Sequence, residues 1–274
     1  MPDLRALPGA VRRRLAAPIL RALGGARDRS VFDLEDRVRA LEAEWRRYRD
    51  DLVAASFHRD LPLYHQARFG GDPAEIRRQC EGLIEPFRGR QRVLDIGCGR
   101  GIFLALMRDQ GIGGYGIDLD DRMLEECRRA GLDARPGDAL AHLGGLPAGS
   151  LDGIFARHLA EHLLPGELVR LVHECRRVLR PGAPIVMVAP DPATLTVGAH
   201  SFWLDPQHVR PLPSALLAFY AEIAGFADIE VRTSSPSETR LTAEAQASSE
   251  DLRIIDRTLF GDRDYAVLAR APSA

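Results

Sequence analysis

A glycine-rich turn and two groups of histidines are the residues of this chain whose types and spacing could do chemistry. The turn reads V-L-D-I-G-C-G-R-G over residues 93–101, and a helical pattern follows from Ile102. Glycine permits positive φ and lets a ligand approach the main chain with no Cβ in the way. In an open α/β sheet, ligands bind at the carboxyl end of such a strand. The turn therefore predicts a ligand site.

Two aspartates indicate which ligand the turn fits. Its glycines are Gly97, Gly99 and Gly101, so the third arrives one residue earlier than in the G-x-G-x-x-G fingerprint of dinucleotide sites. Asp95 precedes them and would repel a pyrophosphate, whereas it could attract an ammonium group. Asp118 ends the next expected strand, where a carboxylate can accept hydrogen bonds from ribose hydroxyls. The pattern favours a nucleoside that carries a positive charge and no phosphates.

The histidines offer acid–base or metal-binding chemistry, because imidazole titrates near neutral pH and ligates metals. His158 and His162 bound the run H-L-A-E-H, directly after an expected strand. Taken alone, H-x-x-E-H also occurs as an inverted zinc-protease motif, but its place after a sheet strand argues against a protease. The second group reads D-P-Q-H, in which Asp205 could orient His208.

Alternating strands and helices are expected to position these residues. Strands are predicted over residues 92–96, 114–118, 151–156 and 183–188. Helices are predicted over residues 102–110, 122–130 and 165–179. Apolar strands that alternate with helices indicate parallel βαβ units in a doubly wound sheet. Two later strands, 228–232 and 265–269, would form a hairpin-like edge, and the stretch 233–250 between them is either a loop or an insertion.

The first 57 residues are expected to form a helical, partly basic extension of a main domain that covers residues 58–274. Residues 1–29 carry seven arginines against two aspartates, which suits either contact with an anionic membrane surface or a solvated extension. Apolar residues of the 34–52 segment recur in steps of four and three. This seam predicts a helix that either joins two copies of the chain as a homodimer or lies on the main domain.

Composition limits the class of protein. The 274 residues are 45% hydrophobic and 28% charged, as expected for a globular domain with a sizeable core. The net charge of −2 provides no global positive field, so nucleic acid is not an expected partner. The four cysteines lack zinc-finger or C-x-x-C spacing, so we expect free thiols and a cytoplasmic protein. Neither an apolar run long enough to span a membrane nor a signal peptide is recognised.

The successive motifs D-I-G-C-G-R-G, G-I-D-L-D and G-D-A-L resemble those of class I S-adenosylmethionine-dependent methyltransferases. The resemblance implies a Rossmann-like, mostly parallel sheet of seven strands, with S-adenosylhomocysteine as the product. It implies that the first motif surrounds the methionine part, that Asp118 holds the ribose, and that the adenine lies among the later residues. The cofactor-binding residues so implied are Arg77, Asp95, Gly97, Cys98, Gly99, Gly101, Asp118, Leu119, Asp138, Ala139 and His158.

Two further stretches, 64–79 and 202–211, resemble methyltransferases encoded with bacterial O-antigen and other polysaccharide genes. This resemblance implies an O-methyltransferase whose acceptor is a sugar hydroxyl of a glycan or glycoside. The acceptor cavity would be lined by Tyr64, Arg68, Phe202, Trp203 and Arg210. Ala67 and Gly70 depart from the pattern of the first stretch. The alternatives are a small natural product or quinone precursor as acceptor, or a non-catalytic cofactor-binding subunit of a glycan-assembly complex.

Such a reaction needs a group that removes the proton of the acceptor, because a protonated alcohol is a poor nucleophile. We expect His162 to be this base, with His208, oriented by Asp205, as the second candidate. Ubiquinone-pathway O-methyltransferases show E-x-x-E-H at the place of H-L-A-E-H and bind a divalent metal through it. His158 replaces the first glutamate here, so the pattern allows a divalent metal without favouring it.

Overall fold

The computed structural model describes residues 42–46, 71–237, 239–243 and 248–273. The chain divides into two compact units, residues 1–67 and 68–274. In the first unit, residues 42–46 are helical. The basic segment 1–29, the rest of the 34–52 seam, Tyr64 and Arg68 lie outside the described residues. No helix within the described ranges is long and apolar enough to cross a membrane.

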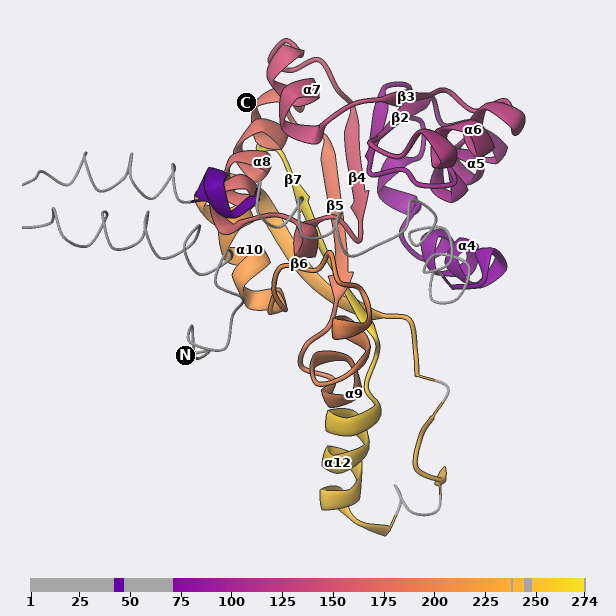
Figure 1. Cartoon of the computed structure of the whole chain (residues 1–274), viewed down its shortest axis with the longest axis vertical. Coiled ribbons are helices and arrows are strands. Elements are labelled where there is room, and N and C mark those ends of the chain that lie inside the picture. Colours follow the sequence, from indigo (N-terminus) through magenta and orange to yellow (C-terminus); the bar gives the residue numbers. More distant parts are fainter. Residues whose placement is uncertain (1–41, 47–70, 238, 244–247, 274) are drawn as a thin grey trace, which may run out of the picture. The chain divides into compact units, whose positions relative to one another are not determined.

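The second unit is built on one seven-stranded sheet in the order β3-β2-β1-β4-β5-β7-β6 (Figure 1). Only β7 runs antiparallel to its two neighbours. This confirms the predicted doubly wound, mostly parallel sheet. The strands are β1 Val93–Ile96, β2 Gly114–Asp118, β3 Ala134–Pro136, β4 Gly153–Arg157, β5 Pro184–Pro190, β6 Ala227–Ser234 and β7 Asp264–Arg270.

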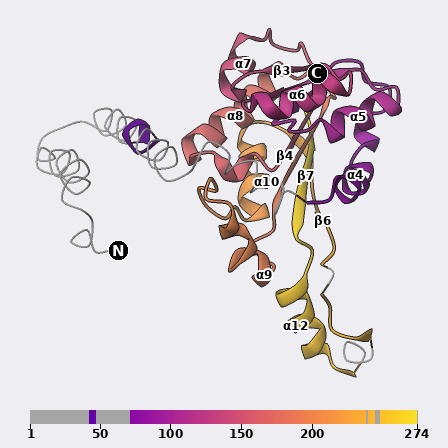
Figure 2. The same cartoon turned by 45° about the vertical axis from the view of Figure 1, so that its right-hand side comes forward.

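Helices cover both faces of the sheet (Figure 2). On one face lie α4 (Pro73–Glu81), α5 (Ile102–Asp109) and α6 (Asp121–Arg129). On the other lie α7 (Ala139–Gly145), α8 (Pro165–Val178) and α10 (Ser214–Ile223). Because side chains alternate along a strand, each central strand serves both cores. In β1, Val93 packs toward α5 whereas Leu94 and Ile96 pack toward α8.

Aspartates cap the helices that begin near the carboxyl edge of the sheet. The Asp120 side chain accepts a hydrogen bond from the main-chain N–H of Arg122 and starts α6. Asp138 likewise accepts from Ala141 N and starts α7. Such caps satisfy main-chain donors that have no partner inside the helix.

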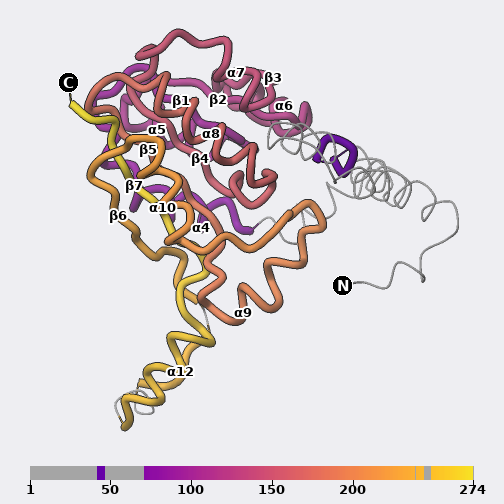
Figure 3. The backbone as a smooth tube through the Cα atoms, turned by 90° about the vertical axis from the view of Figure 1, so that its left-hand side faces the viewer, coloured from indigo at the N-terminus to yellow at the C-terminus, as the bar shows by residue number. Residues whose placement is uncertain are grey.

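The hairpin-like edge predicted at the end of the chain is present, with an arm inserted between its two strands. The chain leaves β6 at Ser235 and returns at Arg263, whose N–H donates to the Ser235 carbonyl. The arm contains α12 (Glu250–Phe260), which extends beyond the sheet next to α9 (Leu195–Gly198) (Figure 3). The hydroxyl of Thr196 donates to the Leu259 carbonyl and joins α9 to α12.

The structure predicts that Gly101→Ala destabilises the fold. Gly101 has φ +73°, and an added Cβ would lie 2.6 Å from Leu132 Cδ1 and 2.8 Å from Cys127 Sγ. Backbone strain and overpacking together should lower the free energy of unfolding by about 2–4 kcal/mol in a urea titration. Gly149→Ala is the matched control, because its φ is +62° and no atom lies within 4 Å of its added Cβ. Equal losses in the two variants would contradict the packing argument.

Candidate active site

The glycine turn lies where the order of the sheet reverses, between β1 and its neighbours β2 and β4. Gly97, Gly99 and Gly101 have φ values of 72°, 51° and 73°, which side chains with a Cβ rarely adopt. The N–H groups of Gly97 and Cys98 both donate to the Ile117 carbonyl at the end of β2. A turn at this switch point leaves its main chain open to a ligand.

Asp118 fixes the turn through both of its carboxylate oxygens. Oδ2 accepts the Gly99 N–H at 2.8 Å, and Oδ1 accepts the Asp120 N–H at 2.8 Å. One carboxylate therefore ties the glycine turn to the start of α6. Leu119, between these residues, is 76% exposed, so its side chain is accessible to a ligand bound at the turn.

Asp95 is buried on the α5 side of β1. Burial and the nearby charge of Asp118 raise the pKa of its carboxyl well above the ordinary value. A cation bound nearby would offset both effects, because an opposite charge favours the ionised form of a carboxyl group. An added Cβ on Gly99 would meet no atom within 4 Å, so there is open space beside the turn. These residues fit a positively charged nucleoside.

Other sequence-predicted cofactor residues take different positions. Cys98 is buried, and its side chain fills the space beside Gly116, so only its main chain faces the turn. Asp138 is exposed at the start of α7, next to the half-buried Ala139. Arg77 pairs with Asp109 at 2.9 Å, at the end of α5 remote from the glycine turn. Its contact with the cofactor carboxylate stays a prediction.

The turn after β4 brings the first histidine group next to the glycine turn. An added Cβ on Gly97 would lie 3.7 Å from Leu159 Cδ1. His162 follows within the short helix η3 (Ala160–His162). Burial lowers the pKa of His162, and this effect outweighs the opposing charge of Glu161. His162 is therefore neutral at pH 7 and can accept a proton.

The second histidine group joins the first in space. Val209 N donates to the Glu161 carbonyl at 2.8 Å, which holds the 205–210 loop against η3. The rings of His162 and His208 meet edge to face with centroids 4.7 Å apart. His208 Nε2 lies 3.9 Å from both Glu161 Oε1 and Asp205 Oδ2.

His158 connects Glu161 to a further charged group at the same edge of the sheet. Its Nδ1 lies 3.1 Å from Glu161 Oε1, and its Nε2 lies 3.4 Å from Asp264 Oδ1. Burial and Arg157 would lower the pKa of His158, but Asp264 and Glu161 outweigh them and raise it to about 9. Burial would raise the pKa of Asp264, but His158 and Arg157 lower it to about 2. At neutral pH this network is fully ionised.

The predicted acceptor residues separate into buried and exposed ones. Phe202 is buried, and its ring packs against His208 with centroids 4.4 Å apart, so it supports the histidine. Trp203 is 58% exposed, while its Nε1 donates to the Gly198 carbonyl and fixes the ring. The Arg210 guanidinium donates to the Tyr220 hydroxyl at 3.3 Å.

Sequence reasoning missed Arg157, Glu161 and Asp264 as members of the site. Glu161 is part of the H-L-A-E-H motif, but the sequence did not show that its carboxylate is buried beside His158, His162 and His208. Arg157 ends β4, a position that parallel sheets give to ligand-binding residues. Asp264 lies far along the chain at the start of β7, and only the pairing of β7 with β5 brings it to this edge.

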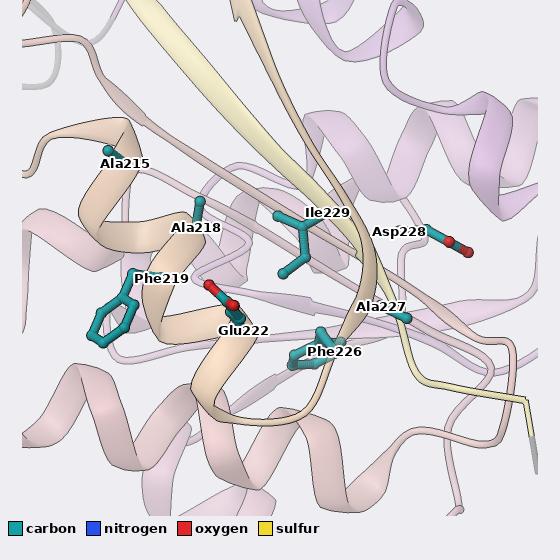
Figure 4. Close-up of a pocket in the computed structure, with 8 residues that line it drawn as sticks. All are labelled: Ala215, Ala218, Phe219, Glu222, Phe226, Ala227, Asp228 and Ile229. Carbon is teal, nitrogen blue, oxygen red and sulfur yellow. The ribbon is translucent and has the colours of Figure 1, made fainter.

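A hollow of about 510 Å³ lies elsewhere, between α10 and β6 (Figure 4). Ala218, Phe219, Glu222 and Ile229 are among the residues that line it. β6 is the outermost strand on its side of the sheet, four places from β1. The hollow is therefore separate from the glycine turn and the histidines.

The strand order and the glycine turn define the class I methyltransferase fold, a Rossmann-like domain. A family model described as a methyltransferase domain matches residues 94–187. The crystal structure of an S-adenosylmethionine-dependent methyltransferase from Archaeoglobus fulgidus is similar at a TM-score of 0.70 and 30% identity. The match covers 76% of this chain and 98% of that one. The chain belongs to the S-adenosylmethionine-dependent methyltransferases.

Curated relatives agree with this assignment. A probable S-adenosylmethionine-dependent methyltransferase of Mycolicibacterium smegmatis is 35% identical over 136 residues, 49% of this chain and 51% of the relative. A malonyl-[acyl-carrier protein] O-methyltransferase of Erwinia pyrifoliae is 34% identical over 154 residues, 54% of this chain and 52% of the relative. The matches thus span about half the length of each of these relatives. S-adenosylmethionine is accordingly the methyl donor of the family.

Asp118→Asn should weaken S-adenosylmethionine binding at least tenfold in calorimetric titration. An amide can keep only one of the two acceptor oxygens and carries no charge, and a hydrogen bond to a charged group contributes about 1.5–3 kcal/mol. Asp121→Asn is the control, because Asp121 is exposed in the first turn of α6. Unchanged affinity in Asp118→Asn, or an equal loss in Asp121→Asn, would remove Asp118 from the donor site.

The pairing of His158 with Asp264 predicts a loss of stability at alkaline pH. Because the pKa of His158 is raised to about 9, its contribution is complete below the ordinary histidine pKa of about 6.5 and is lost as pH rises through 9. Between these pH values the free energy of unfolding should fall by about 1–3 kcal/mol more in the wild type than in Asp264→Asn. The contribution of Asp264 is lost only as pH falls through about 2. Parallel stability profiles, measured by urea titration, would contradict the pairing.

Proposed function

We propose that this chain transfers the methyl group of S-adenosylmethionine to a hydroxyl of a sugar in a bacterial glycan or glycoside. The observation that carries the proposal is the neutral, half-buried imidazole of His162, three residues after the Leu159 side chain that lies against Gly97 of the glycine turn. The donor is already activated, so the protein must align the acceptor and take its proton. An imidazole in this state supplies the proton acceptor that an alcohol requires.

The surroundings of His162 support this role. The packing of Leu159 next to Gly97 brings the His158–His162 run alongside the donor turn. Glu161 is buried and its pKa is lowered by the neighbouring histidines, although burial opposes this, so it stays ionised. A carboxylate beside His162 would stabilise the imidazolium that forms when the base takes a proton.

Two residues next to the histidines suit a sugar. Trp203 presents an exposed ring whose orientation is fixed by its hydrogen bond to Gly198. A flat aromatic face packs well against the apolar face of a pyranose. Arg210 is half-buried, and its guanidinium carries five donors, of which Tyr220 takes one. The others can reach acceptor hydroxyls.

Two alternatives use the same donor site. The first is an O-methyltransferase of a small natural product or quinone precursor, which the base chemistry also serves. The Erwinia relative is named for methyl transfer to oxygen on an acyl-carrier substrate, which supports oxygen as the acceptor atom without specifying a sugar. The second is a non-catalytic cofactor-binding subunit of a glycan-assembly complex, against which the neutral imidazole of His162 argues.

We also propose a cytoplasmic location, which the thiols support. Cys80, Cys98, Cys127 and Cys175 are free and buried. Four unpaired thiols favour a reducing environment, and we place the protein in the cytoplasm. Membrane contact through residues 1–29 and homodimerisation through the 34–52 segment remain proposals from the sequence.

The proposal is tested by release of S-adenosylhomocysteine with a panel of sugars, glycosides and phenols. We expect turnover with sugars, and His162→Ala should lower kcat by about 10²-fold or more while the donor affinity stays the same. Because the pKa of His162 is lowered, the rate of the wild type should fall only below about pH 6.5.

His173→Ala is the matched control, because His173 is exposed on α8 outside the site. Turnover with phenols and none with sugars would select the first alternative. Full activity in His162→Ala would exclude His162 as the base, and a failure to turn over any acceptor while the donor binds would favour the non-catalytic subunit.

A further inference from the structure

Glu161, His162 and His208 form a compact group, which we call the Glu161 cluster. Each offers one ligating atom, and these three atoms all lie within 4.8 Å of one another. The group is assembled from two segments of the chain, the η3 turn and the 205–210 loop, which the Val209–Glu161 hydrogen bond holds together. The main-chain hydrogen bond between these two segments makes the cluster part of the fold.

Glu161 carries the strongest sign of a missing partner. Its side chain is fully buried, yet neither Oε1 nor Oε2 accepts a hydrogen bond from any residue that the structure describes. His158 lies against Oε1 at 3.1 Å, so it balances part of the charge, while Oε2 is left without a partner among the described groups. A buried carboxylate oxygen in this state is costly unless another group binds it.

His208 is oriented as a metal ligand would be. Its Nδ1 lies 2.6 Å from the Phe202 carbonyl, which can only accept, so Nδ1 carries the proton. In the neutral ring the lone pair is then on Nε2, which lies 3.9 Å from Glu161 Oε1. A metal-ligating histidine is typically held in this way, with its other ring nitrogen bonded to a carbonyl or carboxylate. Phe202 also packs against the ring and prevents it from turning.

We propose that the Glu161 cluster binds a divalent transition-metal ion of the Zn²⁺ type through the Glu161 carboxylate, His162 and His208 Nε2. Two imidazoles and one carboxylate are a frequent zinc set, whereas Mg²⁺ prefers oxygen ligands alone. Zinc bonds of about 2.1 Å set ligand atoms about 3.4 Å apart in a tetrahedron. The ligating atoms of the Glu161 cluster lie within 4.8 Å of one another, so side-chain shifts of about 1 Å would bring them to the tetrahedral separation.

Three protein ligands leave the fourth position open. Such a position accepts water or a substrate oxygen and lowers the pKa of the bound group. The metal would use the His162 lone pair that the proposed function assigns to proton transfer, so base and metal-bound forms are alternative states of this site. The metal-binding inference itself stands on the cluster geometry and requires no particular acceptor.

The test is Zn²⁺ binding to the purified full-length chain after metal removal, measured by competition with a chromogenic chelator. We expect one Zn²⁺ per chain, not displaced by a hundredfold excess of Mg²⁺. Co²⁺ in its place should give the visible absorption of a tetrahedral site. His208→Ala and Glu161→Gln should each weaken Zn²⁺ binding at least tenfold, and His162→Ala provides a third variant if a buried substitution impairs folding.

His173→Ala is again the matched control and should bind Zn²⁺ as the wild type does. The inference is overturned if the folded wild type binds no Zn²⁺, or if His208→Ala and His162→Ala retain wild-type affinity, since the four cysteines are present in every variant. Methyl transfer is assayed separately on the same samples. A chain that binds Zn²⁺ but methylates no sugar would contradict the proposed function alone, and metal-free sugar methylation without Zn²⁺ binding would contradict this inference alone.

Discussion

The hydrogen bonds of the Asp118 carboxylate hold the donor half of this molecule together. One oxygen takes the N–H of Gly99 and the other takes the N–H of Asp120, so the glycine turn after β1 cannot move without disturbing the end of β2 and the start of α6. The same carboxylate raises the pKa of the buried Asp95. A cationic ligand bound beside the turn would favour the ionised form of Asp95 and so lower this pKa again. This electrostatic interaction would contribute to binding of the positively charged donor.

Local sequence was sufficient to predict the strands and helices around the glycine turn. The glycines, Asp95 and Asp118 are fixed by the strand-turn-helix pattern, and the four main strands and the first helices lie within a residue or two of their predicted bounds. β3 was not located from the sequence, because this strand has only three residues, Ala134–Pro136, is partly polar and lies at the edge of the sheet. The prediction also left the 233–250 stretch open, since its Ser, Thr and Glu residues have no clear period.

The acceptor half depends on contacts that no local pattern encodes. His208 meets Glu161 and His162 only because a main-chain hydrogen bond fastens the 205–210 loop to η3. Asp264 reaches His158 only because β7 inserts antiparallel beside β5. Motif spacing could identify the histidines as candidates. It could not show that Phe202 packs against His208 or that Arg77 forms an ion pair with Asp109. Burial and tertiary pairing, which decide charge states, are visible only in three dimensions.

The arm between β6 and β7 is closed at its base. Ser235 donates to Asp264, and Arg263 N donates back to the Ser235 carbonyl, so the intervening residues enter and leave the sheet through one clamp. The entropy of closing a loop grows slowly with its length, and a graft of different size could therefore be exchanged there with the donor turn untouched. Because Asp264 also pairs with His158, any such exchange that moved Asp264 would change the charge environment of the histidines.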